Sequence, residues 1–191
     1  MERLIVAVED KQKWNKKYQN KPIPDKPIKL ITDFANLATG TKALDIACGM
    51  GRHSKYLASQ GFEVDALDIS SLAIDTLQGT PNINPIEVDF DTYTLSKNSY
   101  DLIVCTFFLK RELFPQMIDA LNEGGILIYE TFVYHPDNQQ VPSQRSYLLE
   151  EGELEHTFAN ALELIESREY WDETTEGFKM RKASIVGRKK M

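Results

Sequence analysis

A glycine-containing segment and a later acidic residue give the clearest chemical signal in this sequence. Asp45 begins the run DIACGMGR, whose glycines are Gly49 and Gly51, and Asp68 ends the next apolar run. Glycine allows a sharp turn that lies close to a ligand, and a helix that starts there directs free N–H groups toward it. A carboxylate after the second strand can accept hydrogen bonds from both hydroxyls of a ribose. The spacing therefore predicts a nucleoside-binding turn.

Two classes of nucleotide cofactor use such a turn, and the surrounding side chains distinguish them. Dinucleotide folds use GxGxxG, in which the third glycine allows close helix packing beneath a pyrophosphate. Here the third position is Ser54, and Asp45 lies four residues before Gly49, where its charge would repel a pyrophosphate. S-adenosylmethionine carries a sulfonium and an ammonium, so an acid beneath the turn favours that cofactor. The alternative is a tight turn that is braced by an acid and binds no ligand.

The segment 45–70, DIACGMGRHSKYLASQGFEVDALDIS, resembles the first two motifs of class I S-adenosylmethionine-dependent methyltransferases. The GRxS turn and the sequence EGEL at 151–154 are most similar to the small bacterial branch that includes the tellurite-resistance methyltransferases. Residues 108–132 are also similar to small bacterial methyltransferases of unassigned substrate. This resemblance covers most of residues 41–160. It implies a Rossmann-like fold, S-adenosylmethionine as cofactor and S-adenosylhomocysteine as product.

Strand and helix patterns alternate along the chain, which indicates an α/β sheet with helices on both faces. Apolar runs predict strands at 42–47, 63–69, 84–88, 100–107, 126–132, 162–171 and 181–188. Caps and helical spacing predict helices at 10–18, 28–38, 52–60, 70–77, 112–121 and 149–158. Asp10 is expected to cap the first of these helices, and Gly124 and Gly125 to terminate the fifth.

The last two predicted strands are joined by residues 172–179 without a helix, so we expect them to form an antiparallel hairpin. The predicted fold is therefore a Rossmann-like, doubly wound sheet of seven strands, mostly parallel, with this hairpin at its C-terminal end. We expect a single methyltransferase domain, in which residues 1–40 are helical and residues 41–191 form the cofactor-binding sheet and its helices.

Ligands of such sheets bind outside the carboxyl ends of the strands, so residues that follow the strands are the site candidates. Asp89 and Phe90 are placed to bind the adenine, or else form a helix cap and a core position. Arg52 can contact the cofactor carboxylate or pair with Asp45. Trp14 and Tyr18 form an aromatic face that either docks on the domain or covers the cofactor. The predicted cofactor-binding set is Asp45, Ala47, Gly49, Gly51, Arg52, Asp68, Ile69, Asp89, Phe90, Cys105, Trp14 and Tyr18.

Methyl transfer is an in-line displacement, and it needs a base only where the nucleophile holds a proton. Glu130, at the end of the fifth strand, is the candidate to bind or deprotonate the acceptor, or else it braces a turn. Arg111 holds the edge of the active site or caps its helix. These two are the catalytic candidates. The long loop at 133–146 is expected to take part in function.

Composition narrows the function further. The net charge of −7 argues against a broad nucleic-acid-binding surface. The sequence contains no apolar run of 18 residues, so we expect no membrane-spanning helix. Acidic residues at 169–176 favour a neutral or cationic small-molecule acceptor over an anionic metalloid. Cys48 and Cys105 are expected to be small apolar fillers in a cytoplasmic protein, with no metal site. A nicotinamide-dependent oxidoreductase and a non-catalytic cofactor-binding module are the alternatives, and the sequence leaves the acceptor and the oligomeric state open.

Overall fold

A seven-stranded sheet, with the order β3-β2-β1-β4-β5-β7-β6, forms the centre of the structure. The computed structural model describes residues 2–20, 24–140, 144–174 and 176–190. Its strands are β1 (Lys42–Ile46), β2 (Glu63–Asp68), β3 (Ile83–Glu87), β4 (Tyr100–Thr106), β5 (Leu121–Phe132), β6 (Leu162–Glu173) and β7 (Lys179–Lys189). Strands β1 to β5 pair in parallel, and β7 is antiparallel to both β5 and β6. The predicted sheet and its C-terminal hairpin are confirmed.

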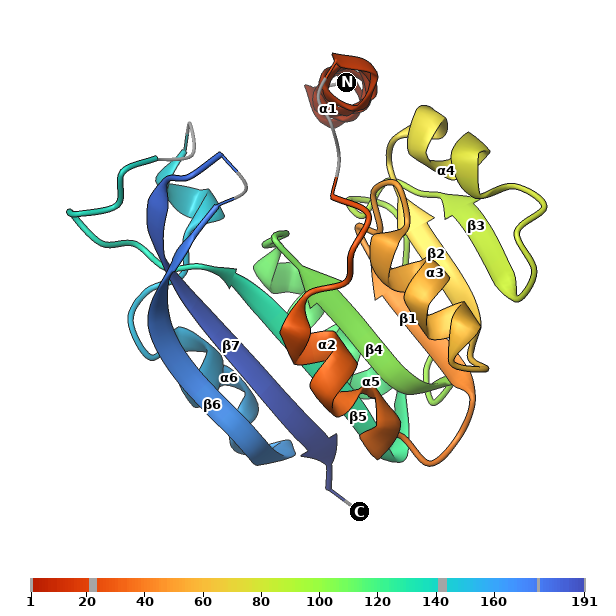
Figure 1. The fold of residues 1–191 in the computed structure, drawn as a ribbon, viewed down its shortest axis with the longest axis vertical. Coiled ribbons are helices and arrows are strands. Elements are labelled where there is room, and N and C mark those ends of the chain that lie inside the picture. The colour runs from red at the N-terminus through yellow and green to blue at the C-terminus, as the bar shows by residue number, and fades with distance from the viewer. Residues whose placement is uncertain (1, 21–23, 141–143, 175, 191) are drawn as a thin grey trace.

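Helices cover both faces of this sheet. They are α1 (Glu2–Asn20), α2 (Lys29–Phe34), α3 (Arg52–Ser59), α4 (Ser71–Leu77), α5 (Phe114–Ala120) and α6 (Glu153–Phe158), with single 3-10 turns at Ala35–Leu37, Arg111–Leu113 and Arg145–Tyr147. Figure 1 shows α2 and α3 in front of the sheet and α5 and α6 behind it. Within the described ranges, none of these helices is long and apolar enough to cross a membrane.

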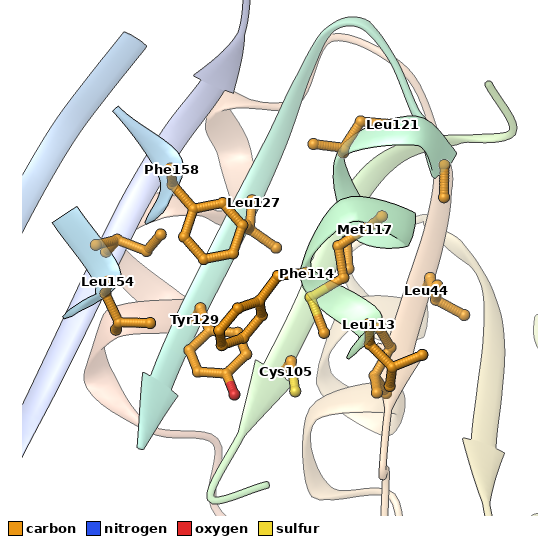
Figure 2. Packing of buried hydrophobic residues seen from close by; sticks show 14 of the residues in the cluster. Leu44, Cys105, Leu113, Phe114, Met117, Leu121, Leu127, Tyr129, Leu154 and Phe158 are labelled. Atoms are coloured by element: carbon orange, nitrogen blue, oxygen red, sulfur yellow. The ribbon is translucent and has the colours of Figure 1, made fainter. Parts of the chain in front are cut away.

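The hydrophobic core lies on both sides of the central strands. Leu102, Ile103 and Val104 are consecutive in β4 and fully buried, as expected for a strand with helices on both faces. Behind the sheet, the rings of Phe114 and Phe158 lie 5.1 Å apart, and both contact the core around Tyr129 (Figure 2). This packing holds the carboxyl ends of the strands in fixed positions.

Two predicted helix starts are wrong. The first helix begins at Glu2, because residues 2–9 are rich in good helix formers, so Asp10 lies inside the helix and does not cap it. The last helix begins at Glu153 instead of residue 149, because Leu149 forms a parallel β-bridge with Val133, just beyond the end of β5. The N–H of Leu149 donates to the Phe132 carbonyl at 2.9 Å, and its carbonyl accepts from the N–H of Tyr134 at 2.8 Å.

The fifth helix ends within one residue of the predicted position, but the predicted role of Gly124 and Gly125 as its terminators is wrong. Helix α5 ends at Ala120, and Gly124 and Gly125 lie inside β5, where the pairing with β4 shifts register. A Cβ on Gly125 would lie 2.9 Å from the carbonyl oxygen of Asn122 and 3.1 Å from that of Tyr100. The glycine pair therefore allows a bulge in a strand, where the sequence suggested a helix terminator.

Candidate functional site

The segment between β1 and α3 forms a left-handed turn at the carboxyl ends of the strands. Ala47, Gly49 and Gly51 have φ angles of 55°, 54° and 76°. A Cβ on Gly49 would lie 2.9 Å from the hydroxyl of Tyr18, and one on Gly51 would lie 2.4 Å from the side chain of Leu77. The lack of a side chain therefore lets α1 pack closely on Gly49 and α4 pack closely on Gly51. Sequence reasoning assigned both to ligand approach and missed the contact with Leu77.

Asp45 lies directly beneath this turn. Its carboxylate is 1% exposed and accepts a 2.6 Å hydrogen bond from the hydroxyl of Ser54 in α3. Burial raises the pKa of Asp45 to about 7. Ser54, which stands where a dinucleotide-binding turn has its third glycine, is thus the hydrogen-bond partner of Asp45. The buried carboxyl group of Asp45 lies where its charge would repel a pyrophosphate.

Asp68, at the end of β2, fixes the same turn from the next strand. Its Oδ2 accepts from the N–H of Gly49 and its Oδ1 from the N–H of Ser70, each at 2.8 Å. Burial raises the pKa of Asp68, whereas these backbone hydrogen bonds oppose the rise. Each carboxylate oxygen has a second acceptor position, so these bonds leave capacity for two hydroxyl donors.

Helix α1 covers the turn. Figure 1 shows it beyond the ends toward which the arrows of β1 and β2 point. The side-chain oxygen of Asn15 accepts a 2.6 Å hydrogen bond from the hydroxyl of Ser70, and its amide donates to the hydroxyl of Ser71 at 3.1 Å. The rings of Trp14 and Tyr18 lie 5.6 Å apart between centroids and are tilted by 34° to each other. The hydroxyl of Tyr18 lies over the turn, 2.9 Å from the position that a Cβ of Gly49 would take. Burial, followed by the charge of Asp68, raises the pKa of Tyr18.

The residues expected around an adenine follow β2 and β3. Ile69, Asp89 and Phe90 are half-buried. Asp89 Oδ1 accepts from the N–H of Asp91 at 2.9 Å, so the carboxylate also stabilises a local turn. A cavity of about 280 Å³ is lined by Phe90, Asp91, Thr92, Tyr93, Thr94, Lys110, Glu112 and Gln116. Cys105 is fully buried in the core, side chain and backbone alike, so it is a core residue here and offers no surface to a cofactor.

Glu130 lies at the carboxyl end of β5 and is 3% exposed. Its carboxylate accepts a 2.5 Å hydrogen bond from the hydroxyl of Tyr170 and lies 3.6 Å from the ammonium of Lys182. Sequence reasoning missed Lys182, which β7 places 5% exposed beside Glu130. A lysine followed by the apolar run ASIV at the end of the chain was the available signal.

Phe107 connects this acidic residue with the glycine turn. It has a left-handed backbone, with φ 56°, and its N–H donates to the carbonyl of Glu130 at 2.8 Å. The guanidinium of Arg52 lies 5.3 Å from the centroid of its ring, and the ammonium of Lys182 lies 4.9 Å from it. Arg52 follows Gly51 directly, so one ring contacts cations from both groups of candidate residues.

Arg111 holds a loop and a helix start. Its Nε and Nη2 donate to the two carboxylate oxygens of Glu153 at 2.6 and 2.8 Å. Its Nη1 and Nη2 also donate to the carbonyls of Ser146 and Leu148, each at 3.0 Å. Arg111 therefore joins the segment 146–148 to the start of α6, and whether it also forms the edge of the active site stays a prediction.

The loop after β5 is tied to β7. The Asn138 amide donates to the carbonyl of Val133 at 2.9 Å, and its oxygen accepts from the N–H of Arg181 at 2.8 Å. Residues 141–143 of the expected functional loop 133–146 lie outside the described residues. The described part of the loop therefore packs beside the strand that carries Lys182.

Comparison with known proteins identifies relatives along most of the chain. A family model described as "Tellurite resistance protein TehB" matches residues 6–182. TehB of Haemophilus influenzae, named a "Probable S-adenosyl-L-methionine-dependent methyltransferase", is 31% identical over 180 residues, which cover 84% of this chain and 61% of that protein. The chain thus spans about three fifths of the length of the curated relatives that it matches first.

Solved structures agree with this result. The crystal structure of TehB from Haemophilus influenzae matches with a TM-score of 0.76 and 28% identity, over 94% of this chain and 67% of that chain. A methyltransferase structure from Methanosarcina mazei matches with a TM-score of 0.65 and 20% identity, over 87% of this chain and 99% of that chain. The second match shows a shared fold. The family expected from the glycine turn is confirmed.

Proposed function

We propose that this chain, which belongs to the TehB family of tellurite resistance proteins, transfers a methyl group from S-adenosylmethionine to a small acceptor molecule. The observation that carries the proposal is the buried carboxyl group of Asp45 beneath the left-handed turn. An acid in this place suits a cationic ligand and opposes a pyrophosphate. When bound, S-adenosylmethionine supplies a methyl group on a sulfonium, which an acceptor displaces in line.

The residues around the turn fit this cofactor. Asp68 would accept hydrogen bonds from the ribose hydroxyls through its remaining acceptor positions. Asp89 and Phe90 would contact the adenine, which Ile69 would face from the end of β2. Arg52, whose guanidinium pKa is lowered by burial, would pair with the cofactor carboxylate.

Helix α1 would close over the bound cofactor. The supporting contacts are the hydrogen bonds of Asn15 to Ser70 and Ser71 and the position of Tyr18 above Gly49. A cover of this kind excludes water from the sulfonium during transfer. Trp14, whose ring contacts that of Tyr18, would complete the cover.

The proposal extends to the organisation of the protein. We treat residues 1–191 as one methyltransferase domain, because α1 is hydrogen-bonded to the start of α4. Cys48 and Cys105 are free and buried, which supports a location in the cytoplasm. The net charge of −7 supports a small-molecule acceptor over nucleic acid.

Ligand-dependent melting tests the proposal against its main competitor. We expect S-adenosylhomocysteine to raise the melting temperature and NAD to leave it unchanged, because only a ligand of the native state stabilises it. The opposite ranking would favour the oxidoreductase. Incubation with S-adenosylmethionine and candidate acceptors should then release S-adenosylhomocysteine. Binding without release for every acceptor would favour a non-catalytic module.

A further inference from the structure

Five polar side chains gather on one face of the sheet at the carboxyl end of β5. We call them the Lys182 cluster, and its members are Lys182, Glu130, Tyr170, Asp172 and Ser184. The strand register brings them together. Glu130 is paired with Ser184 across β5 and β7, and Lys182 is paired with Tyr170 across β7 and β6, so their side chains share a face.

Two charged side chains of the cluster, Lys182 and Glu130, are almost fully buried. The side chains of Lys182 and Glu130 are 7% and 4% exposed, and the ammonium lies 3.6 Å from the carboxylate. Lys182 also donates to Asp172 at 2.7 Å, and Asp172 is half-exposed. An ammonium carries three donors, so Lys182 has capacity for a further acceptor atom. Asp172 connects the cluster with solvent, and its displacement would admit a ligand.

The buried hydroxyl of Ser184 also points to a bound ligand. Its side chain is 1% exposed, and its hydroxyl has no hydrogen-bond partner among the described residues. A buried hydroxyl without a partner destabilises a protein, so such a group calls for an explanation. It lies opposite Glu130 and two residues from Lys182, where a bound molecule could supply the missing partner.

Aromatic rings form the apolar walls beside the ammonium. The centroids of Phe107 and Phe132 lie 4.9 and 5.9 Å from Lys182 Nζ and 5.4 Å from each other. A molecule that contacts Lys182 would therefore also contact apolar ring surface. Arg52, the first residue of α3 after the glycine turn, contacts the same Phe107 ring, which places the cluster next to the proposed cofactor site.

We propose that the Lys182 cluster is the acceptor site, and that its acceptor is a small aromatic molecule with an ionised thiol or hydroxyl group. This inference rests on the proposed function. Lys182 and the Ser184 hydroxyl would hold the anionic atom, and Phe107 and Phe132 would contact the aromatic body. Glu130 is a positioning residue for Lys182, because Tyr170 and Lys182 already occupy its carboxylate. The acid-rich hairpin suggested a neutral or cationic acceptor, but that pattern did not include the buried lysine.

The charges balance in this reaction. The acceptor loses its proton to solvent before transfer, and the ammonium of Lys182 stabilises the resulting anion. A lone pair of the anion forms the new bond to the methyl carbon. The bond between the methyl group and sulfur breaks, and its electrons stay on sulfur. A positive sulfur centre and a negative acceptor atom thus become two neutral groups.

The experiment compares acceptors and variants of the full chain. Release of S-adenosylhomocysteine is measured with substituted thiophenols and phenols, with benzylamine and with tellurite. We expect the thiophenols and phenols to be methylated fastest. Lys182→Met should raise the acceptor KM about tenfold or more, because a charge-assisted contact is lost. It should also move the acid limb of the kcat profile to higher pH, because kcat reports groups in the bound complex. Lys182→Arg retains the positive charge and should bring the acceptor KM and the acid limb of the kcat profile close to those of the parent.

Two further variants separate binding from folding. Lys189→Met removes a lysine at the other end of β7 and should leave acceptor KM unchanged. Ser184→Ala should raise acceptor KM severalfold without lowering the melting temperature, because it removes a hydroxyl that has no partner among the described residues. A purely structural role for the cluster would predict a lower melting temperature in Lys182→Met with an acceptor KM as unchanged as that of Lys189→Met.

Several outcomes would overturn the inference. Faster turnover of tellurite or benzylamine than of any thiophenol or phenol would reject the acceptor class. An unchanged KM and pH profile in Lys182→Met and Ser184→Ala would reject the site. Calorimetry with S-adenosylmethionine keeps this result apart from the proposed function: normal cofactor binding with these outcomes rejects only the acceptor site, whereas absent cofactor binding rejects both.

Discussion

The N–H of Gly49 donates a 2.8 Å hydrogen bond to Oδ2 of Asp68, so the residue expected to bind the ribose also holds the turn beneath it. The other oxygen of Asp68 accepts from Ser70, at the start of α4. One carboxylate therefore connects the glycine turn, the end of β2 and the helix on which α1 rests. Ligand binding and local structure are coupled at this point.

Replacement of Asp68 should affect both cofactor binding and the local structure of the glycine turn. Asp68→Ala is expected to weaken S-adenosylmethionine binding by about 2–3 kcal/mol, since charge-assisted bonds to two hydroxyls are lost. Asp68→Asn retains one oxygen acceptor and should lose less. Calorimetry on the two variants, with circular dichroism to establish folding, measures the effect. An unchanged affinity in folded Asp68→Ala would remove the ribose role.

The stability of the protein should depend on pH through Asp45. Burial raises its pKa to about 7 from the usual 3.8, so between these values the native state binds more protons than the unfolded state. Its contribution to the free energy of unfolding therefore falls as pH rises through this window, by at most about 4 kcal/mol. Asp45→Asn avoids this loss. Its melting temperature relative to the parent should be higher at about pH 8 than at about pH 5.

The exposed Asp75 of α4 provides the matched control for that measurement. Asp75→Asn should show the same difference from the parent at both pH values. An equal pH dependence in Asp45→Asn and the parent would mean that another group is responsible.

The cover formed by α1 should depend on Asn15. Asn15→Ala removes its hydrogen bonds to Ser70, Ser71 and Leu72, and should free the helix. We expect faster amide exchange in residues 2–20 and faster release of S-adenosylmethionine, measured by stopped flow, because opening of the cover would limit release. Lys16→Ala, on an exposed position of the same helix, is the control. Unchanged release with faster exchange would show that α1 does not cover the cofactor.

Glu130→Gln should separate cofactor binding from acceptor binding. Glutamine can still accept from Tyr170, but it leaves Lys182 without one of its two anionic partners. We expect S-adenosylmethionine affinity to stay close to that of the parent and kcat/KM for the acceptor to fall about tenfold or more. Glu163→Gln, at the exposed opposite end of β6, should change neither. Equal loss of cofactor binding would make Glu130 a general structural brace.

Arg111 should matter for stability more than for catalysis. Arg111→Ala removes paired hydrogen bonds to Glu153 and contacts with two loop carbonyls, so we expect it to lower the free energy of unfolding by about 1–3 kcal/mol. A lysine cannot donate to both carboxylate oxygens of Glu153 in the same paired geometry, so Arg111→Lys should recover only part of the lost free energy of unfolding. Denaturant unfolding gives the comparison. A large fall in kcat with unchanged unfolding would place Arg111 at the reacting atoms instead.

The fold and the cofactor turn could be predicted because their signals are local. The strands β1 and β2, the glycines between β1 and α3, and the acids Asp45 and Asp68 all lie within the 27 consecutive residues 42–68. The missing helix before the last strand indicated the antiparallel hairpin for the same reason. The predictions that failed were two helix starts and one helix terminator. At Gly124 and Leu149, pairing with a distant strand segment replaced the local preference.

The sequence by itself determined the family, the seven-stranded topology and the acidic glycine turn, since periodicity and short motifs act between near neighbours in the chain. Only the tertiary structure decided what surrounds each candidate. Tyr18 lies over Gly49, Leu77 requires Gly51, and Lys182 neutralises Glu130. The last contact depends on the register of β5 and β7, strands whose paired residues are 50 or more positions apart. A shift of one residue would turn Lys182 to the other face, and no local pattern fixes that register.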